Sequence, residues 1–183
     1  MKKISIVLSL LILSVVNMSA QSLYHTWRGM RQADETLSSW VYIAFIDADN
    51  SFAIVSQSTF ANEDCSFEIN TRGYGMYSFD GERLNIMLNE SETKSSLENI
   101  IYSDTMEKKF RRGELKKSDM NKEIKGVFME SKNDLEESIN ELGKQFRNCR
   151  VIRVTNTKLY LQMGPDDDDP LEIFDLDDEF ALD

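Results

Sequence analysis

The chain has 183 residues, with 32 acidic side chains against 21 Lys and Arg, and its net charge is −11. This balance argues against nucleic acid as a partner, because binding a polyanion requires neutralising cations. Apolar residues make up 41% of the chain, which excludes wholesale disorder and allows one domain with a substantial core. A single His and two Cys leave little material for a transition-metal centre, so we expect no metal and no cofactor.

The first 20 residues have the layout of a signal peptide. Lys2 and Lys3 precede an apolar run at 4–16, and the small residues Ser19 and Ala20 offer a cleavage point. The apolar run is too short to span a bilayer comfortably, and no later segment is longer. We therefore expect an exported protein, periplasmic or extracellular, that does not span a membrane.

The chain from residue 23 to residue 90 shows the pattern of consecutive antiparallel strands. We expect strands at 40–47, a continuous apolar and β-branched run, at 51–60, which is rich in Phe, Ile, Val and Thr, and at 74–79. We also expect strands at 65–70 and 84–88, where apolar and polar residues alternate. The pair Asp80-Gly81 is typical of a two-residue hairpin turn. Such alternation predicts strands with one buried face and one solvated face.

The middle of the chain predicts a helical insertion at 118–148. Apolar residues recur with the period of an α-helix at Leu135, Ile139, Leu142 and Phe146. Asn133 is the expected N-cap of that helix. A shorter helix is expected before it, on the apolar residues Met120, Ile124 and Phe128. Residues 106–110 fit a helix or a strand equally well.

The strand pattern returns after the insertion. We expect strands at 151–155 and 159–163, and residues 171–174 offer a last edge strand. About eight to ten short strands joined by tight turns favour a barrel or a sandwich. A barrel removes strand edges most completely, so we expect an up-and-down β-barrel with one or two helices.

Three short motifs carry a resemblance to a known family. They are YHTWRG at 24–29, YSFDG at 77–81 and VTNTKL at 154–159. In these motifs the chain resembles the bacterial lipocalin-like proteins of the calycin group. The resemblance implies a mainly β, antiparallel up-and-down barrel, with Trp27 as a structural residue at its closed end. His25 stands where the family's Gly would sit, and the insertion is long for a small lipocalin.

The expected organisation is therefore a signal peptide at 1–20, a lipocalin-like barrel at 21–165 and an acidic C-terminal tail at 166–183. The last of these segments has ten acidic residues and no cation. Its run of four Asp at 166–169 lacks the ligand spacing of a calcium loop. A solvated charged tail is the usual form of such a segment.

A barrel of about eight strands encloses a space that side chains fill or that holds one small ligand. We expect a small apolar or amphipathic ligand to contact inward-facing residues, namely Phe52, Ile54, Phe67, Leu84, Ile86 and Leu161. The alternative is a filled barrel in a non-enzymatic module that binds a protein partner through the helical insertion or the acidic tail.

The sequence offers no catalytic constellation. His25 is the only imidazole, and no Ser or Cys is placed as its nucleophile, so we expect no catalytic residues and no enzyme. An oxidising compartment would permit a disulfide between Cys65 and Cys149, and the alternative is two buried free thiols.

Cations gather in one segment of this acidic chain. The cluster comprises Lys108, Lys109, Arg111, Arg112, Lys116, Lys117, Lys122 and Lys125, interrupted by acidic residues. Three interpretations remain open: a docking strip for the acidic tail, a site for an acidic partner or glycan, or an ordinary exposed surface of mixed charge.

Overall fold

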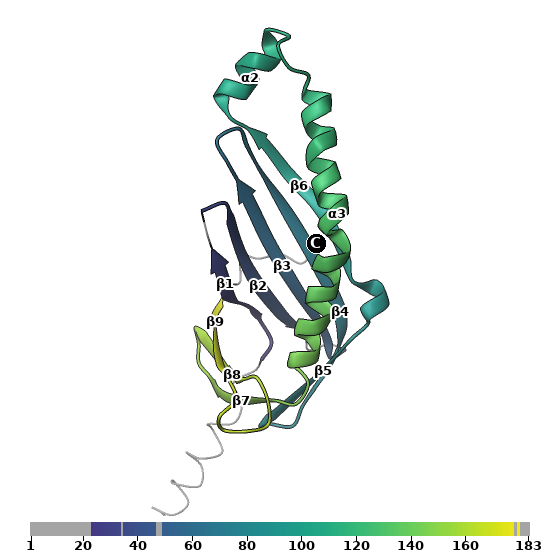
Figure 1. The fold of residues 1–183 in the computed structure, drawn as a ribbon. Helices are drawn as coiled ribbons and strands as arrows, with labels where there is room; N and C mark the ends of the chain where they lie inside the picture. The colour runs from purple at the N-terminus through teal and green to yellow at the C-terminus, as the bar shows by residue number, and fades with distance from the viewer. Residues whose placement is uncertain (1–22, 34, 47–48, 178, 180–183) are drawn as a thin grey trace, which may run out of the picture.

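The computed structural model describes residues 23–33, 35–46, 49–177 and 179. It confirms the expected fold class, because the chain is mainly β and forms a closed antiparallel barrel accompanied by two α-helices (Figure 1). The predicted signal peptide, residues 1–20, lies outside the described residues.

The described part of the chain consists of nine strands, two α-helices and one 3₁₀ turn. The strands are β1 (Thr26–Ala33), β2 (Leu37–Ile46), β3 (Ser51–Ala61), β4 (Cys65–Phe79), β5 (Arg83–Leu88), β6 (Lys94–Tyr102), β7 (Cys149–Val154), β8 (Lys158–Gln162) and β9 (Leu171–Leu176). The helices are the short 3₁₀ turn η1 (Glu90–Glu92), α2 (Asp104–Arg111) and α3 (Lys117–Gln145).

Eight strands close into a ring in the order β1-β2-β3-β4-β5-β7-β8-β9, and β9 returns to β1. We call this ring the closed barrel. β6 is a ninth strand outside the ring, and it pairs with the first half of β4, whereas β5 pairs with the second half. The first half of β4, the end of β3, β6, α2 and the first half of α3 form a separate part, which we call the upper sheet.

Gly75 lies where β4 passes from β6 to β5. It pairs with Leu88 at the end of β5, and a Cβ atom at this position would overlap the Met87 carbonyl oxygen. Only a residue without a side chain allows the two backbones to approach this closely. The glycine therefore marks the junction between the closed barrel and the upper sheet.

Trp27, at the start of β1, is only 1% exposed and lies in the core of the closed barrel. Its indole nitrogen Nε1 donates a hydrogen bond to the Leu23 carbonyl oxygen at 3.0 Å. The buried indole thus keeps its one polar atom satisfied, as a buried Trp requires.

Residues 106–110, whose sequence fits a helix or a strand, lie in the helix α2. Ser103 caps it, since its side chain accepts a hydrogen bond from the Met106 backbone nitrogen at 3.4 Å. Met106 is buried with Cys65, and the Phe110 ring meets the Tyr102 ring edge-on at 5.0 Å. α2 therefore packs its apolar side chains into the upper sheet rather than extending β6.

The expected pair of helices within 118–148 is one continuous helix, α3. Asn133 lies in its interior and so does not cap a second helix. The reason is that the apolar residues of both halves fall on one face: Leu135 follows Ile124 by eleven residues, close to three helical turns. None of the described helices has a segment long and apolar enough to cross a membrane.

The last strand was expected at an edge, but β9 pairs on both sides. Ile173 lies opposite Tyr160 of β8, and Leu176 lies opposite Trp27 of β1. Residues up to Leu176 therefore belong to the barrel, although they fall within the segment predicted as the acidic tail. The sequence predicted this strand only as an edge at 171–174, because its second partner, β1, lies at the other end of the chain.

Candidate functional site

Large apolar side chains pack together in the interior of the closed barrel. Its largest residues, among them Phe45, Phe52 and Phe174, are almost fully buried. Phe146, which directly follows α3, enters this core and packs against Phe52 and Phe174, with ring centroids 6.4 and 6.2 Å apart. The helical insertion thus contributes side chains to the barrel core.

The residues predicted to contact a ligand fall into two groups. The first group lies in the filled core and comprises Phe52, Ile54, Leu84, Ile86 and Leu161. Phe67 is different, because it lies above the barrel and lines a hollow in the upper sheet. Of these six residues, it is the one found in the lining of the three hollows described below.

This hollow, which we call the apical hollow, has a volume of about 280 Å³ and lies between the end of β3, the start of β4 and the first half of α3. The rings of Phe60 and Phe67 stack on its sheet side, 5.1 Å apart and 14° from parallel. Its lining is mostly apolar and consists of Thr36, Phe60, Ala61, Asn62, Cys65, Phe67, Met120, Glu123, Ile124 and Val127.

The strand register explains why the hollow is separate from the barrel core. Phe60 pairs with Phe67, but the next inward pairs toward the barrel are Ser58 with Ile69 and Ser56 with Thr71. Apart from Ile69, these inward residues are small hydroxyl side chains, which fill less space than the aromatic residues above and below them. The apolar residues therefore form two clusters instead of one.

Polar contacts hold α3 against the sheet. The Thr93 hydroxyl donates a hydrogen bond to the Asn140 side-chain oxygen at 2.6 Å. The Ser95 backbone nitrogen donates one to Glu136 at 2.8 Å. These bonds fix the second half of α3 against the sheet, below the apical hollow.

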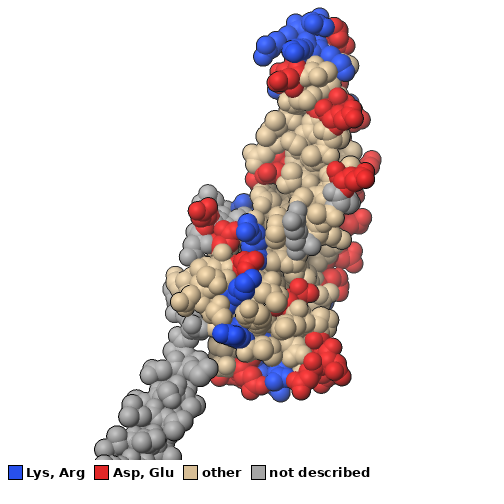
Figure 2. Space-filling view, turned by 90° about the vertical axis from the view of Figure 1, so that its left-hand side faces the viewer, with Lys and Arg blue, Asp and Glu red and all other residues tan. Residues whose placement is uncertain are grey.

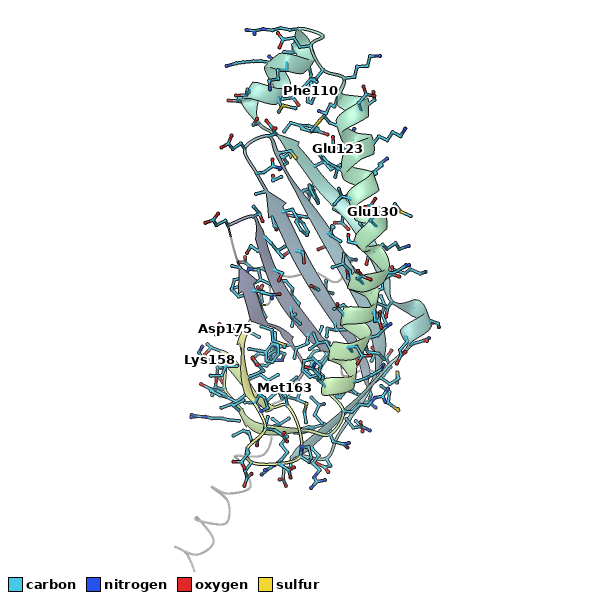
Figure 3. All side chains as sticks on the ribbon, viewed as in Figure 1. Phe110, Glu123, Glu130, Lys158, Met163 and Asp175 are labelled. Atoms are coloured by element: carbon cyan, nitrogen blue, oxygen red, sulfur yellow. The ribbon has the colours of Figure 1, made fainter. Side chains whose placement is uncertain are left out.

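The rim of the apical hollow is polar. The Asn62 side-chain oxygen accepts hydrogen bonds from the backbone nitrogens of Asp64 and Cys65, both at 2.9 Å, which fixes the β3–β4 turn. Glu123 projects from α3 at the same level (Figure 3). A carboxylate at the mouth of an apolar hollow favours a ligand whose polar end carries a hydrogen-bond donor or a positive charge.

Two further hollows have more polar linings. One, of about 540 Å³, lies beside the second half of α3, and its lining includes Asp134, Glu137 and Glu141. The other, of about 600 Å³, lies over β4 and β6, with Arg72 and Lys94 in its lining. The apical hollow therefore has the most apolar lining of the three.

Cys65 and Cys149 are both buried free thiols, so the disulfide considered from the sequence is not formed. Cys65 begins β4, whereas Cys149 pairs with Leu84, which in turn pairs with Phe79 at the other end of β4. Fourteen residues of strand correspond to roughly 40 Å or more, and a disulfide requires Cα atoms within about 7 Å.

Neither thiol is activated as a nucleophile. Burial raises the pKa of Cys65, and it raises the pKa of Cys149 to about 12, with a smaller contribution from Asp169. A protonated thiol is a poor nucleophile and a poor metal ligand. His25 packs edge-on against Trp27, with ring centroids 5.8 Å apart. Within the described ranges, no group of three or more His, Cys, Asp or Glu is arranged to hold a metal ion.

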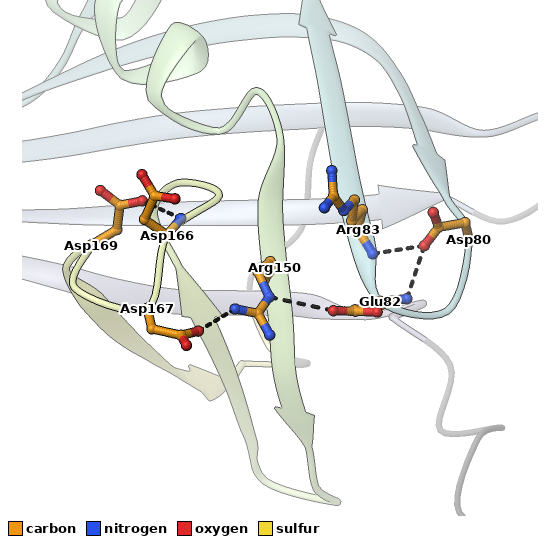
Figure 4. A network of polar contacts seen from close by, with 7 residues as sticks. All are labelled: Asp80, Glu82, Arg83, Arg150, Asp166, Asp167 and Asp169. Atoms are coloured by element: carbon orange, nitrogen blue, oxygen red, sulfur yellow. Dashed lines mark hydrogen bonds and ion pairs between the residues drawn. The ribbon is translucent and has the colours of Figure 1, made fainter.

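Several acidic residues of the 166–183 segment pair with cations of the barrel. Arg150 of β7 makes ion pairs with Asp167 and with Glu82, the latter at 3.4 Å (Figure 4). Lys158 pairs with Asp175 at 2.7 Å. Acidic residues of this segment therefore pair with cations of β7 and β8. The basic cluster of 108–125 lies toward the opposite end of the molecule (Figure 1).

The basic cluster forms an exposed tip. Lys and Arg side chains gather at the end of the molecule made by α2 and the start of α3 (Figure 2). Leu115 is 40% exposed within this tip. Some of the cations are paired, since Lys117 lies 3.0 Å from Glu107 and Arg112 lies 3.7 Å from Glu114.

Most residues of the apical hollow were not among the predicted ligand contacts. The sequence predicts a helix that contains Met120 and Ile124, and their spacing of four residues indicates that they share one face of it. Phe60 ends a predicted strand, but its partner across the hollow lies more than 50 residues away in the sequence. No local pattern connects the two segments.

The barrel is compatible with the calycin-like fold that the motifs suggested. Comparison of the chain with known protein families, with curated proteins and with solved structures gave no match.

Proposed function

We propose that this chain is an exported, non-enzymatic, lipocalin-like binding protein that holds a small apolar or amphipathic ligand in the apical hollow. The observation that carries the proposal is the stacked pair Phe60 and Phe67 facing apolar residues of α3 across a space of about 280 Å³. Ligand sites are typically apolar clefts of about 300–1,000 Å³ with a few polar groups at the edge. This hollow is at the lower limit of that range, which favours a small ligand.

The polar rim narrows the ligand class further. The acidic side chain of Glu123 disfavours an anionic head group, because like charges in a partly desolvated site repel. A neutral or cationic head with a short apolar body fits the arrangement best. The filled core of the closed barrel supports this location over the barrel interior that the sequence suggested.

The test is titration with a neutral fluorescent apolar probe, N-phenyl-1-naphthylamine, followed by displacement with a short alkylamine. Val127 lines the hollow and is 52% exposed, so Val127→Asp should not unfold the protein. We expect it to weaken probe binding by about tenfold, since a charge in an apolar site costs more than about 1 kcal/mol.

The matched control is Met129→Asp, on the same helix. Met129 is 63% exposed and is not in the lining of the hollow. This variant should bind the probe as the unaltered chain does. Equal loss in both variants, or no saturable binding in the unaltered chain, would contradict the proposal.

A second function is favoured by a different observation, the exposed basic tip on an acidic protein. In this alternative the molecule is a filled-barrel module that binds an acidic protein partner through α2 and the start of α3. Binding of that kind weakens steeply with salt. The double change Arg111→Glu and Arg112→Glu should abolish partner binding and leave the probe titration unchanged, whereas Val127→Asp should do the reverse.

A further inference from the structure

Among the described strands, β6 differs from the others because it pairs on one side only. Each strand of the closed barrel has a neighbour on both sides, whereas β6 pairs with β4 alone. The free side of a strand carries backbone N–H and C=O groups that can pair with a strand of another chain. We call this side the outer edge of β6.

A hydrogen bond from α3 identifies the residues of β6 that face the outer edge. The Ser95 backbone nitrogen donates to the Glu136 carboxylate at 2.8 Å, so it does not point at Thr71, the residue opposite it on β4. In an antiparallel pair, the backbone groups of alternate residues point to the same side. Leu97 therefore directs its N–H and C=O outward together with Ser95.

Glu136 acts as a cap on the outer edge. α3 crosses in front of β6 (Figure 1) and also contacts β3, β4 and β5, so the helix lies over the sheet and one of its side chains reaches the edge. The Lys132 amino group, one helical turn earlier, lies 3.8 Å from the same Glu136 oxygen. A second strand could bond to Ser95 only after this N–H leaves Glu136.

The regular part of β6 ends at a bulge. Asn99 has a φ of 50°, and Asn99 and Ile100 together lie opposite the single residue Phe67 of β4. A bulge of this kind interrupts the ladder of hydrogen bonds. The regular stretch is therefore 94–98, and its central residue is Ser96.

This stretch is complementary to a second copy of itself. Antiparallel pairing of two copies about Ser96 places Ser95 of one copy opposite Leu97 of the other, so the outward backbone groups of both copies meet. The same register places Lys94 of each copy opposite Glu98 of the other. Opposite charges that face each other across an antiparallel pair stabilise it.

We propose that the outer edge of β6 is the surface through which two copies of this chain associate, and that Glu136 blocks it in the single molecule. When Ser95 is released from Glu136, residues 94–98 of two copies form one antiparallel pair. The upper sheet then continues across a two-fold axis at Ser96, as a symmetric dimer requires. This surface is separate from the apical hollow and from the basic tip.

Sedimentation equilibrium of the full chain measures the association. Glu136→Ala should lower the dissociation constant of the dimer by at least about tenfold, because it frees the edge. Glu137→Ala is the matched control, since it removes the same charge from an exposed position of α3, and it should leave the constant unchanged. Glu136→Gln keeps an acceptor oxygen and should also leave it unchanged.

Cross-linking tests the register. Ser96→Cys places a thiol on the two-fold axis, where the Cα atoms of the two copies would lie about 4.5 Å apart, within the range of a disulfide. Combined with Glu136→Ala, it should form the intermolecular disulfide at least about tenfold faster than with Glu136 retained. Ile101→Cys, at a 63% exposed position beyond the bulge, should not cross-link. The native thiols are buried.

Two further variants complete the test. Ser95→Pro in the Glu136→Ala chain removes the freed donor at a position where an edge strand tolerates proline, and it should restore the monomer. If Glu136→Ala fails to fold, Glu136→Asp shortens the reach of the carboxylate and should promote association in its place.

Three results would overturn the proposal. The first is an unchanged dissociation constant in the folded Glu136 variant, and the second is equal cross-linking of Ser96→Cys and Ile101→Cys. The third is pairing of the freed edge with an unrelated strand-forming peptide without self-association, which would assign the edge to a different partner.

Discussion

The closed barrel and the upper sheet share strands β3 and β4 but bury their side chains differently. In the barrel, aromatic residues from opposite walls and Phe146 pack against one another in the core. In the upper sheet, one helix faces an open sheet, and the apical hollow remains between them. In a closed barrel, strands on all sides direct side chains toward the same interior. A helix that packs on an open sheet contacts it along only one face.

The boundary between the two parts lies at small residues. Ser56 and Ser58 on β3 and Thr71 on β4 separate the two apolar clusters, and Gly75 ends the β5 pairing just below them. Strands β3 and β4 pair without interruption through both parts, yet the buried apolar residues form two separate clusters. The size of the inward side chains decides how far the core extends.

The largest expected effect is on the closed barrel. Trp27→Ala should reduce the free energy of unfolding by about 3–5 kcal/mol, because it leaves a cavity in a close-packed core. Ile101→Ala, at a 63% exposed position of β6, should change it by less than about 0.5 kcal/mol. Urea denaturation measures both, and equal losses would contradict the difference drawn between the two parts.

A pair of glycine changes tests the junction. Gly75→Ala should destabilise the fold by about 1–3 kcal/mol, since the new methyl group would overlap backbone atoms of β5 that cannot move away cheaply. Gly126→Ala should stabilise it by about 0.5–1 kcal/mol, because the residue lies in α3 with open space around it. The two thermal midpoints should therefore move in opposite directions.

Thiol labelling compares the opening of the two parts directly. Cys149 lies in the core of the closed barrel with its pKa raised to about 12, whereas Cys65 lines the apical hollow. We expect Cys65 to react at least about tenfold faster under native conditions, which corresponds to roughly 1.4 kcal/mol less protection. Cys65→Ser and Cys149→Ser assign the two rates, and a faster Cys149 would show that the barrel opens first.

The smallest expected effect is a pH dependence in the β4–β5 hairpin of the barrel. The Asp80 carboxylate accepts hydrogen bonds from the backbone nitrogens of Arg83, at 2.7 Å, and Glu82, at 3.0 Å (Figure 4), and these bonds lower its pKa. A lowered native pKa means that the ionised form stabilises the fold above the ordinary value of about 3.9. The contribution is lost as the pH falls through the lowered pKa.

Asp80→Ala should therefore lower the melting temperature at neutral pH, and its difference from the unaltered chain should shrink in acid. Ile101→Ala, which removes no carboxylate, serves as the control, and its difference from the unaltered chain should be the same at neutral and acid pH. A constant difference for Asp80→Ala across the acid range would contradict this explanation.

The sequence by itself determined the features that depend on neighbours in the chain. Apolar and β-branched runs and period-two alternation predicted most strands, the Asp80-Gly81 pair predicted the hairpin between β4 and β5, and a 3.6-residue period predicted the second half of α3. It also identified Phe67 as an inward residue. These patterns are local, because they fix which side chains share a face of one element.

Only the tertiary structure decided which elements the faces of each strand and helix pack against. Local alternation could not show that β9 closes the ring, that β4 divides its edge between β5 and β6, or that Phe146 enters the barrel core. It could not place Phe60 opposite Ile124, because those contacts join segments more than 60 residues apart. The location of free space depends on the sum of such distant contacts, so the apical hollow emerges only when the whole chain is folded.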